Sequence, residues 1–211
     1  MLRDPMNDLL APRHGLERIQ LPDADVYLQR ALPLSAPADF VLQRLIEQTP
    51  WRSETVILWG KSFAQPRLTA WYGDPGRDYT YSGITMKAEA WTPLLQTLKS
   101  DVEQAAGEEF NSVLLNYYRN ERDSVGYHSD DEKELGPAPT IASLSFGCTR
   151  TFVFKPRQKK RHEPVRIPLE GGSLLLMKGT TQQNWLHAIE KQTRSCGPRV
   201  NLTFRRILSN G

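Results

Sequence analysis

Apolar residues recur along the chain with two spacings, one helical and one alternating. A helical spacing follows Ser35-Ala-Pro37 and predicts a helix capped in that tripeptide, with apolar residues at Phe40, Leu42, Leu45 and Ile46. A second helix is predicted to begin at Thr92-Pro93 and to end near Gly107, with apolar residues at Leu94, Leu95, Leu98 and Val102.

Most of the remaining chain has the short apolar or alternating runs that are typical of β-strands. Turn residues such as Gly136-Pro137 and Gly171-Gly172 separate them. The predicted strands are 54–59, 67–72, 112–119, 140–146, 151–155, 164–169, 173–177 and 199–207. Two helices and many short strands predict an α+β, mainly β protein, with the helices packed on a β-sandwich or jelly roll.

Composition restricts the class of protein. Hydrophobic residues make up 39% and charged residues 24% of the 211 residues, as expected for a globular domain. Residues 1–15 are predicted to form a loose arm, and residues 16–211 a single domain. The net charge of +3 permits a polyanionic partner without requiring one.

Cellular location is predicted from what the sequence does not show. No apolar run approaches the length of a membrane span, and the charged start MLRDPMNDLL does not look like a signal peptide. Cys148 and Cys196 could pair, but two cysteines in a chain without an export signal are expected to be reduced thiols. We therefore expect an intracellular protein, cytoplasmic in a bacterium or nuclear in a eukaryote, and a monomer.

His128-Ser129-Asp130 is the first chemical signal. In an extended segment, residues two apart point to the same side, so His128 and Asp130 can approach one ion. His187 is the best third ligand, because His14 lies in the predicted arm and His162 in a charged loop. Two imidazoles and one carboxylate form the facial triad of iron(II) oxygenases, although zinc hydrolases use similar ligands. A His-x-Asp sequence also occurs by chance.

The segment Arg199 to Arg205 alternates polar and apolar residues. Its polar positions are Arg199, Asn201, Thr203 and Arg205, and its apolar positions are Val200, Leu202 and Phe204. The alternation alone fits a strand whose polar face meets water. If that face lies inside a jelly roll, the buried guanidinium groups need an anion, and a dicarboxylate such as 2-oxoglutarate would satisfy both. Asn116 and Tyr118, two residues apart, can offer an amide and a phenol to the same pocket.

These residues, in this order, resemble the AlkB family of alkylation-repair dioxygenases. The resemblance covers about residues 51–208 and is closest to the members that act on double-stranded DNA. It is carried by Leu58-Trp59-Gly60-Lys61, Tyr79-Thr80-Tyr81-Ser82-Gly83, His128 to Glu132, Ile141 to Gly147 and Pro198 to Ile207.

The resemblance implies a double-stranded β-helix core at about 110–208 and a nucleic-acid-recognition part at about 51–90. It implies that His128, Asp130 and His187 bind Fe(II), with O₂ as the oxidant. The residues implied around the co-substrate 2-oxoglutarate are Asn116, Tyr118, Arg199, Asn201, Thr203 and Arg205. The implied reaction is oxidative demethylation of bases such as 1-methyladenine and 3-methylcytosine in DNA.

Substrate contacts are the next expectation. The resemblance suggests Tyr81 as an aromatic plate on the flipped base, and Asp131 and Glu132 at its polar edge. Trp59 is a candidate wedge in the base stack, or an ordinary core or surface tryptophan. The basic run Arg157 to His162, with Arg157 and Arg161, is either a phosphate contact or a solvated loop.

Other functions stay open at this point. The same dioxygenase chemistry on RNA, on a protein or on a small molecule is one alternative. A binding module with a decayed metal site is another, which the complete set of metal and arginine residues disfavours. A zinc hydrolase is the third, and it would have no use for two arginines facing the metal.

Overall fold

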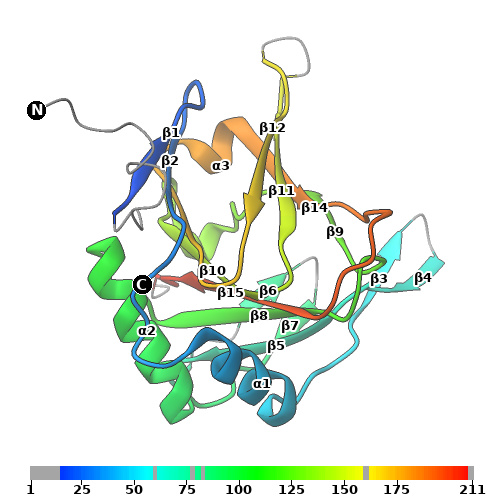
Figure 1. Ribbon diagram of the computed structural model, residues 1–211. Coiled ribbons are helices and arrows are strands. Elements are labelled where there is room, and N and C mark those ends of the chain that lie inside the picture. The colour runs from blue at the N-terminus through cyan, green and yellow to red at the C-terminus, as the bar shows by residue number, and fades with distance from the viewer. Residues whose placement is uncertain (1–14, 59–60, 77–78, 82–83, 159–161, 209–211) are drawn as a thin grey trace, which may run out of the picture.

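The computed structural model describes residues 15–58, 61–76, 79–81, 84–158 and 162–208. Two antiparallel sheets face each other as a sandwich, which confirms the predicted jelly roll (Figure 1). Seven strands form the larger sheet, in the spatial order β1 (Glu17–Ile19), β2 (Asp25–Gln29), β13 (Leu174–Lys178), β10 (Ile141–Gly147), β15 (Arg199–Arg205), β8 (Ser112–Tyr118) and β5 (Leu68–Gly73).

The smaller sheet supplies the opposite wall. Its spatial order is β12 (Val165–Leu169), β11 (Arg150–Pro156), β14 (Trp185–Ile189) and β9 (Val125–His128). Two separate hairpins pair β3 (Thr55–Leu58) with β4 (Lys61–Ala64), and β6 (Tyr79–Tyr81) with β7 (Ile84–Met86). A 3₁₀ turn, η2 (Lys133–Leu135), and a short helix, α3 (Thr181–Asn184), lie in the connections.

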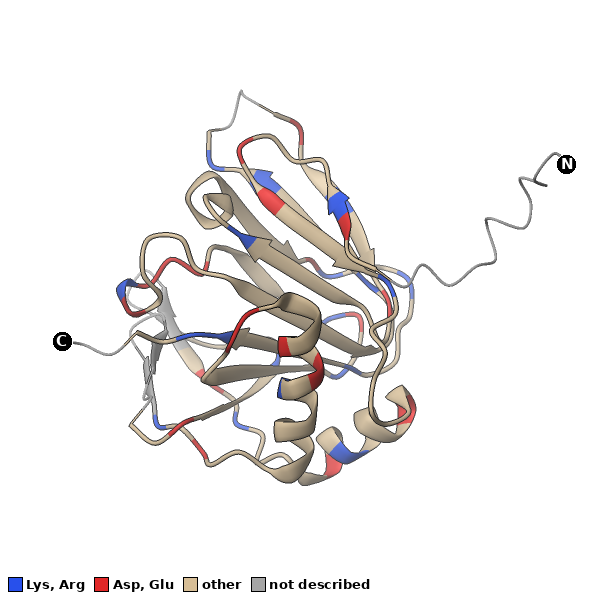
Figure 2. Ribbon diagram, turned by 90° about the vertical axis from the view of Figure 1, so that its left-hand side faces the viewer, with Lys and Arg blue, Asp and Glu red and all other residues tan. Residues whose placement is uncertain are grey.

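Two longer helices cover the outer face of the larger sheet: α1 (Ala38–Gln48) and α2 (Pro93–Ala106). Thr92 caps α2, because its hydroxyl accepts a hydrogen bond from the backbone N–H of Leu95 at 3.2 Å. Gly107 ends α2 at φ 66°, a left-handed conformation that suits glycine. Figure 2 shows acidic and basic residues along the solvent side of both helices.

The predicted cap of α1 is wrong. Pro37 occupies the N-cap position, and α1 has no side-chain capping hydrogen bond. Ser35 instead hydrogen-bonds through both its backbone N–H and its hydroxyl to Asp101 on α2. A serine hydroxyl can donate to any acceptor that the fold brings near it. The position of Ser35 just before α1 therefore did not make it the cap of that helix.

All eight predicted strands are present, with ends within two residues of those expected. The strands that sequence reasoning did not find are β1, β2, β4, β6, β7, β9 and β14. All of them are only three to five residues long, and over so few residues an alternation of polar and apolar positions is rarely distinctive. None of the helices in the described ranges is long and apolar enough to cross a membrane.

The two cysteines form a disulfide, which corrects the expectation of free thiols. Cys148 and Cys196 are bonded, with their Cα atoms 6.1 Å apart. The cause is sheet register: Gly147 at the end of β10 pairs with Arg199 at the start of β15, so the adjoining loops meet. Gly147 lies at φ 84°, and a Cβ there would stand 2.3 Å from the carbonyl oxygen of Pro198.

Candidate metal centre and anion pocket

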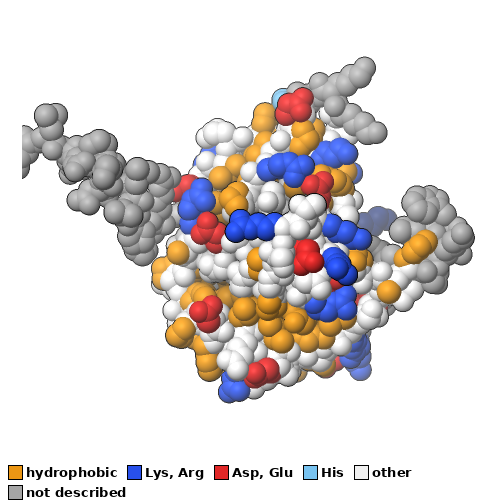
Figure 3. All heavy atoms as spheres, turned by 45° about the vertical axis from the view of Figure 1, so that its right-hand side comes forward, with side chains coloured by type: hydrophobic (Ala, Val, Ile, Leu, Met, Phe, Trp, Pro, Cys, Tyr) orange, Lys and Arg blue, Asp and Glu red, His pale blue; other side chains and the backbone are white. Residues whose placement is uncertain are grey.

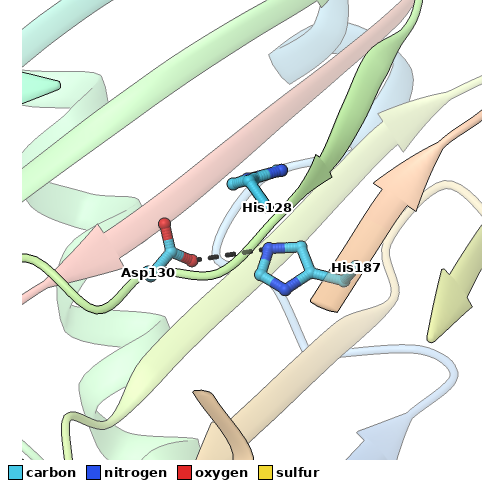
Figure 4. A group of neighbouring side chains, drawn as sticks. All are labelled: His128, Asp130 and His187. Atoms are coloured by element: carbon cyan, nitrogen blue, oxygen red, sulfur yellow. Dashed lines mark ion pairs between the residues drawn. The ribbon is translucent and has the colours of Figure 1, made fainter. Parts of the chain in front are cut away.

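Two neighbouring strands of the smaller sheet bring the three predicted metal ligands together. His128 on β9 pairs directly with His187 on β14, and their ring centroids are 4.3 Å apart. Asp130 follows β9 by two residues, and its Oδ2 lies 3.6 Å from Nε2 of His187 (Figure 4). One ligand atom from each of the three residues lies within 4.8 Å of the others. Two imidazoles and a carboxylate at these spacings fit a divalent metal of the iron(II) type.

The surroundings orient each ligand. Nδ1 of His128 is 2.8 Å from the carbonyl oxygen of Gly126, which leaves Nε2 as its ligand atom. The ring of His187 stacks on Phe152, at a centroid distance of 5.1 Å. Oδ1 of Asp130 accepts a hydrogen bond from Arg205 at 2.6 Å, so Oδ2 is the oxygen that faces the imidazoles.

Burial and nearby charges together set the protonation of these three side chains. Burial alone would raise the pKa of Asp130, but the charges of Arg205 and then of His187 and His128 outweigh it and lower the pKa to about 2. Burial, followed by the charge of His128, lowers the pKa of His187 to about 3. Burial also lowers the pKa of His128. Near neutral pH the carboxylate is therefore ionised and the imidazoles are neutral, as metal ligands must be.

The polar face of β15 forms the floor beside these ligands. Every residue of β15 is buried, so the alternative of a water-facing polar side is wrong. Asn201 donates to the hydroxyl of Ser143 at 2.8 Å, and Thr203 donates to the amide oxygen of Asn201 at 3.0 Å. These bonds hold the polar row on one side of the strand while Val200, Leu202 and Phe204 enter the opposite core.

Arg199 has the side chain best suited to bind an anion in this pocket. The side chain is 1% exposed, its Nη2 donates to the hydroxyl of Ser145 at 3.0 Å, and its guanidinium lies 5.1 Å from the ring centre of Tyr118. Its Nε and Nη1 are buried, and neither has a hydrogen-bond partner among the described residues. Buried guanidinium donors without acceptors are costly, and a carboxylate would satisfy both.

Strand β8 completes the pocket because it pairs with β15 in register. Asn116 lies opposite Asn201 and Tyr118 lies opposite Arg199, so the residues predicted from the two segments share one wall. These residues line one pocket, whose empty volume, including space that is open to solvent, is about 460 Å³. The residues predicted for the metal and 2-oxoglutarate all line it: Asn116, Tyr118, His128, Asp130, His187, Arg199, Asn201, Thr203 and Arg205.

Comparison with known proteins agrees with this geometry. A profile of the 2OG-Fe(II) oxygenase superfamily matches residues 25–205. Alpha-ketoglutarate-dependent dioxygenase alkB homolog 3 of Homo sapiens is 49% identical over 178 residues, which cover 81% of this chain and 62% of that protein. DNA oxidative demethylase ALKBH2 of Homo sapiens is 40% identical over 182 residues, which cover 82% of this chain and 70% of that protein. The chain belongs to the AlkB family. It spans about three fifths of the length of the alkB homolog 3 proteins that it matches.

Solved structures agree with the fold. OsALKBH1 superposes with a TM-score of 0.59 at 16% identity, over 91% of this chain and 100% of the other. A prolyl hydroxylase of Trichoplax adhaerens, in complex with a peptide of hypoxia inducible factor, superposes with a TM-score of 0.58 at 13% identity, over 85% of this chain and 83% of the other. At identities this low, the similarity shows only that this AlkB-family chain shares the double-stranded β-helix fold.

The AlkB-family resemblance also predicted substrate contacts, and the structure places only some of them. Trp59 and Arg161 lie outside the described residues. Tyr81 ends strand β6, and its side chain is outside the described part of the structure. Glu132 lies at the start of η2, where its carbonyl oxygen accepts from the backbone N–H of Leu135 at 2.9 Å. Asp131 is half exposed and is paired with Arg157, for which the sequence left open a phosphate contact or a place in a solvated loop.

Sequence reasoning missed several polar residues of the AlkB-family pocket. Arg67 is 4% exposed, lines the cavity and donates from Nε to the amide oxygen of Asn116 at 2.7 Å. Ser143 and Ser145 on β10 support Asn201 and Arg199. The alternation of polar and apolar residues in β10 is the one sequence signal that could have indicated Ser143 and Ser145 as pocket residues. Arg67 follows Pro66 at the edge of a strand and has no distinguishing pattern.

Proposed function

We propose that this protein is an Fe(II)- and 2-oxoglutarate-dependent dioxygenase that demethylates alkylated bases, such as 1-methyladenine and 3-methylcytosine, in DNA. The observation that carries the proposal is one cavity that holds two features. They are the His128, Asp130 and His187 cluster and the Nε and Nη1 donors of Arg199, which have no hydrogen-bond partner within the described part of the chain. A hydrolytic zinc site would not require the second feature. The names of the two human relatives support both the co-substrate and the demethylation.

Each residue has a distinct part in the proposed reaction. His128, Asp130 and His187 would hold the iron, and Arg199 would bind a carboxylate of 2-oxoglutarate through Nε and Nη1. When bound, iron(II), 2-oxoglutarate and O₂ supply the oxidation that converts an N-methyl group to a hydroxymethyl group, which leaves as formaldehyde. Arg205 keeps Asp130 ionised and oriented throughout.

The apolar part of the cavity wall excludes water from the reacting atoms. Phe152 and Ile189 of the smaller sheet and Met177 of the larger sheet line it, and all three are buried. On the face seen in Figure 3, Lys and Arg side chains gather around its middle, where they can meet a polyanion such as nucleic acid.

The test is a direct assay of demethylation. Anaerobically purified protein is given iron(II), 2-oxoglutarate, O₂ and an oligonucleotide that carries 1-methyladenine, in single- and double-stranded DNA and in RNA. Oligonucleotide mass and succinate are followed together, with 2-oxoglutarate omitted as the control. We expect a loss of 14 Da, about one methylene equivalent, that depends on 2-oxoglutarate. Succinate without demethylation of any strand would contradict the base-repair part of the proposal. The absence of both succinate and demethylated oligonucleotide would contradict the oxygenase activity itself.

A further inference from the structure

The segment that carries the metal-binding carboxylate is not part of a sheet. Strand β9 ends at His128, and residues 129–132 are irregular until η2 begins at Lys133. Asp130 must nevertheless hold its Oδ2 toward the imidazoles. One fixing contact comes from Gln182 on α3, whose amide oxygen accepts from the backbone N–H of Asp130 at 3.0 Å. Gln182 is 1% exposed, so this contact is itself firmly held.

A second contact holds the segment from the side of the smaller sheet. Nη2 of Arg157 donates to the hydroxyl of Ser129 and to Oδ2 of Asp131, and it lies 3.2 Å from the carbonyl oxygen of Gln182. One guanidinium nitrogen therefore contacts the residues on both sides of Asp130. The backbone of Arg157 is fixed in turn, because its N–H donates to the carbonyl oxygen of Asn184 at 2.9 Å.

We propose that Arg157 is a positioning residue for the metal centre: it clamps Ser129 and Asp131 so that Asp130 faces His128 and His187. This differs from the role that the sequence suggested, a contact with a phosphate of the nucleic acid. The inference rests on the proposed function, because it assigns a role at the proposed iron site. Metal sites tolerate only small displacements of a ligand, about 0.5 Å, so a clamp on an irregular segment matters to them.

The solvent exposure of Arg157 and Asp131 distinguishes a positioning role from a general contribution to the stability of the fold. The side chains of Arg157 and Asp131 are 37% and 53% exposed, and exposed ion pairs contribute little to the free energy of unfolding. Asp130 between them is 1% exposed. Loss of the clamp should therefore change metal binding far more than thermal stability.

The experiment measures binding of Co(II), alone, by visible absorption under anaerobic conditions. Arg157→Met removes the clamp, and Arg157→Lys keeps a charge but not the guanidinium. Arg166→Met is the matched control, because Arg166 also makes an exposed ion pair on the smaller sheet, with Glu190 at 2.9 Å, outside the cavity. Ser129→Ala, alone and combined with Arg157→Met, tests whether the two residues act together.

We expect Arg157→Met to weaken Co(II) binding by about tenfold or more, as loss of outer supports of metal ligands does. The Lys variant should recover part of this loss, and Arg166→Met should stay within about twofold of the unsubstituted protein. The Tm of Arg157→Met should fall by less than about 3 °C. Ser129→Ala should cost less in the Arg157→Met background than alone, because its partner is already absent.

Several results would overturn the inference. Unchanged Co(II) affinity in Arg157→Met would do so, and if the salt dependence of oligonucleotide binding fell at the same time, the phosphate role would replace it. Failure of the unsubstituted protein to bind Co(II) would instead contradict the metal centre of the proposed function, and the clamp with it. If Arg157→Met does not fold, unaltered Co(II) affinity in both Arg157→Lys and Ser129→Ala would be decisive against the clamp.

Discussion

The two faces of the seven-stranded sheet are built on different principles. The outer face packs against α1 and α2 through apolar side chains such as Val113, Leu144 and Leu202, each 0% exposed. The inner face also has an apolar cluster, but charged groups interrupt it. Arg199 and Arg205 on this face, and Asp130 from the loop that pairs with Arg205, are each at most 2% exposed.

This difference separates the source of stability from the site of function. Apolar burial on the helix side stabilises the fold by about 25 cal/mol per Å². Buried charges on the inner side cost free energy even when they are paired, as Arg205 is with Asp130. The outer core is therefore built from apolar burial alone, whereas the inner core also accommodates the costly charges of the pocket.

The largest effect is expected at the metal ligands. Asp130→Asn keeps an oxygen that can accept from Arg205 but removes the carboxylate that faces His187. We expect turnover to fall by more than about a hundredfold, because even outer supports of metal ligands matter by ten- to a hundredfold. Steady-state demethylation assays on folded protein measure this. A double-digit percentage of remaining activity would contradict the assignment of the triad.

The helix-side face should show the largest loss of stability. Leu202→Ala removes a fully buried side chain of β15 next to α1 and α2. The free energy of unfolding should fall by about 2–5 kcal/mol, measured by urea denaturation. Leu208→Ala, at a side chain that is 47% exposed, is the control and should change it by less than about 0.5 kcal/mol. Equal losses in the two variants would mean that this core is not the main source of stability.

On the inner face, Arg199→Met should not lower the free energy of unfolding, in contrast to Leu202→Ala. Arg199→Met removes two buried donor atoms that have no acceptor among the residues that the structure describes, so the free energy of unfolding should be equal or higher. Affinity for 2-oxoglutarate should fall by about ten- to a hundredfold, which corresponds to the free energy that hydrogen bonds to a charged group contribute. Thermal unfolding and calorimetry with manganese-loaded protein measure the two quantities.

Arg150→Met provides the contrast to Arg199→Met. Arg150 is 1% exposed but donates to the carbonyl oxygens of Asn120, Asp123 and Glu190, at 3.2, 2.9 and 2.6 Å. Its loss leaves these acceptors unsatisfied, so this variant should be clearly less stable. If both arginine variants lose stability equally, Arg199 is structural and the anion pocket is wrongly assigned.

The smallest effect is expected at the N-cap of α2. Thr92→Ala removes the hydrogen bond to the N–H of Leu95 and should cost about 1 kcal/mol. Thr92→Ser keeps the hydroxyl and serves as the control. Both are compared by urea denaturation, and activity should be unaffected because α2 covers the outer face. A loss of activity at full stability would show that the two faces are coupled.

The sequence by itself determined the local structure of the protein. Alternation in Arg199 to Arg205 fixed which residues of β15 share a face, and the His128-x-Asp130 spacing placed two ligands on one side of the chain. The periodicity of α2, with Thr92 and Gly107 at its ends, fixed that helix. These features depend on neighbours within one or two turns or pleats, and such neighbours are visible in the sequence.

Only the tertiary structure decided which of those faces meet. The pairing of β9 with β14 brings His187 to His128, although the sequence Trp185 to Ile189 lacks the alternation of polar and apolar residues that would predict a strand. The disulfide of Cys148 with Cys196 and the contact of Arg157 with Ser129 likewise join segments far apart in the chain. The reason is physical: local periodicity fixes the direction of a side chain, whereas strand pairing and packing over the whole sandwich decide what it finds there.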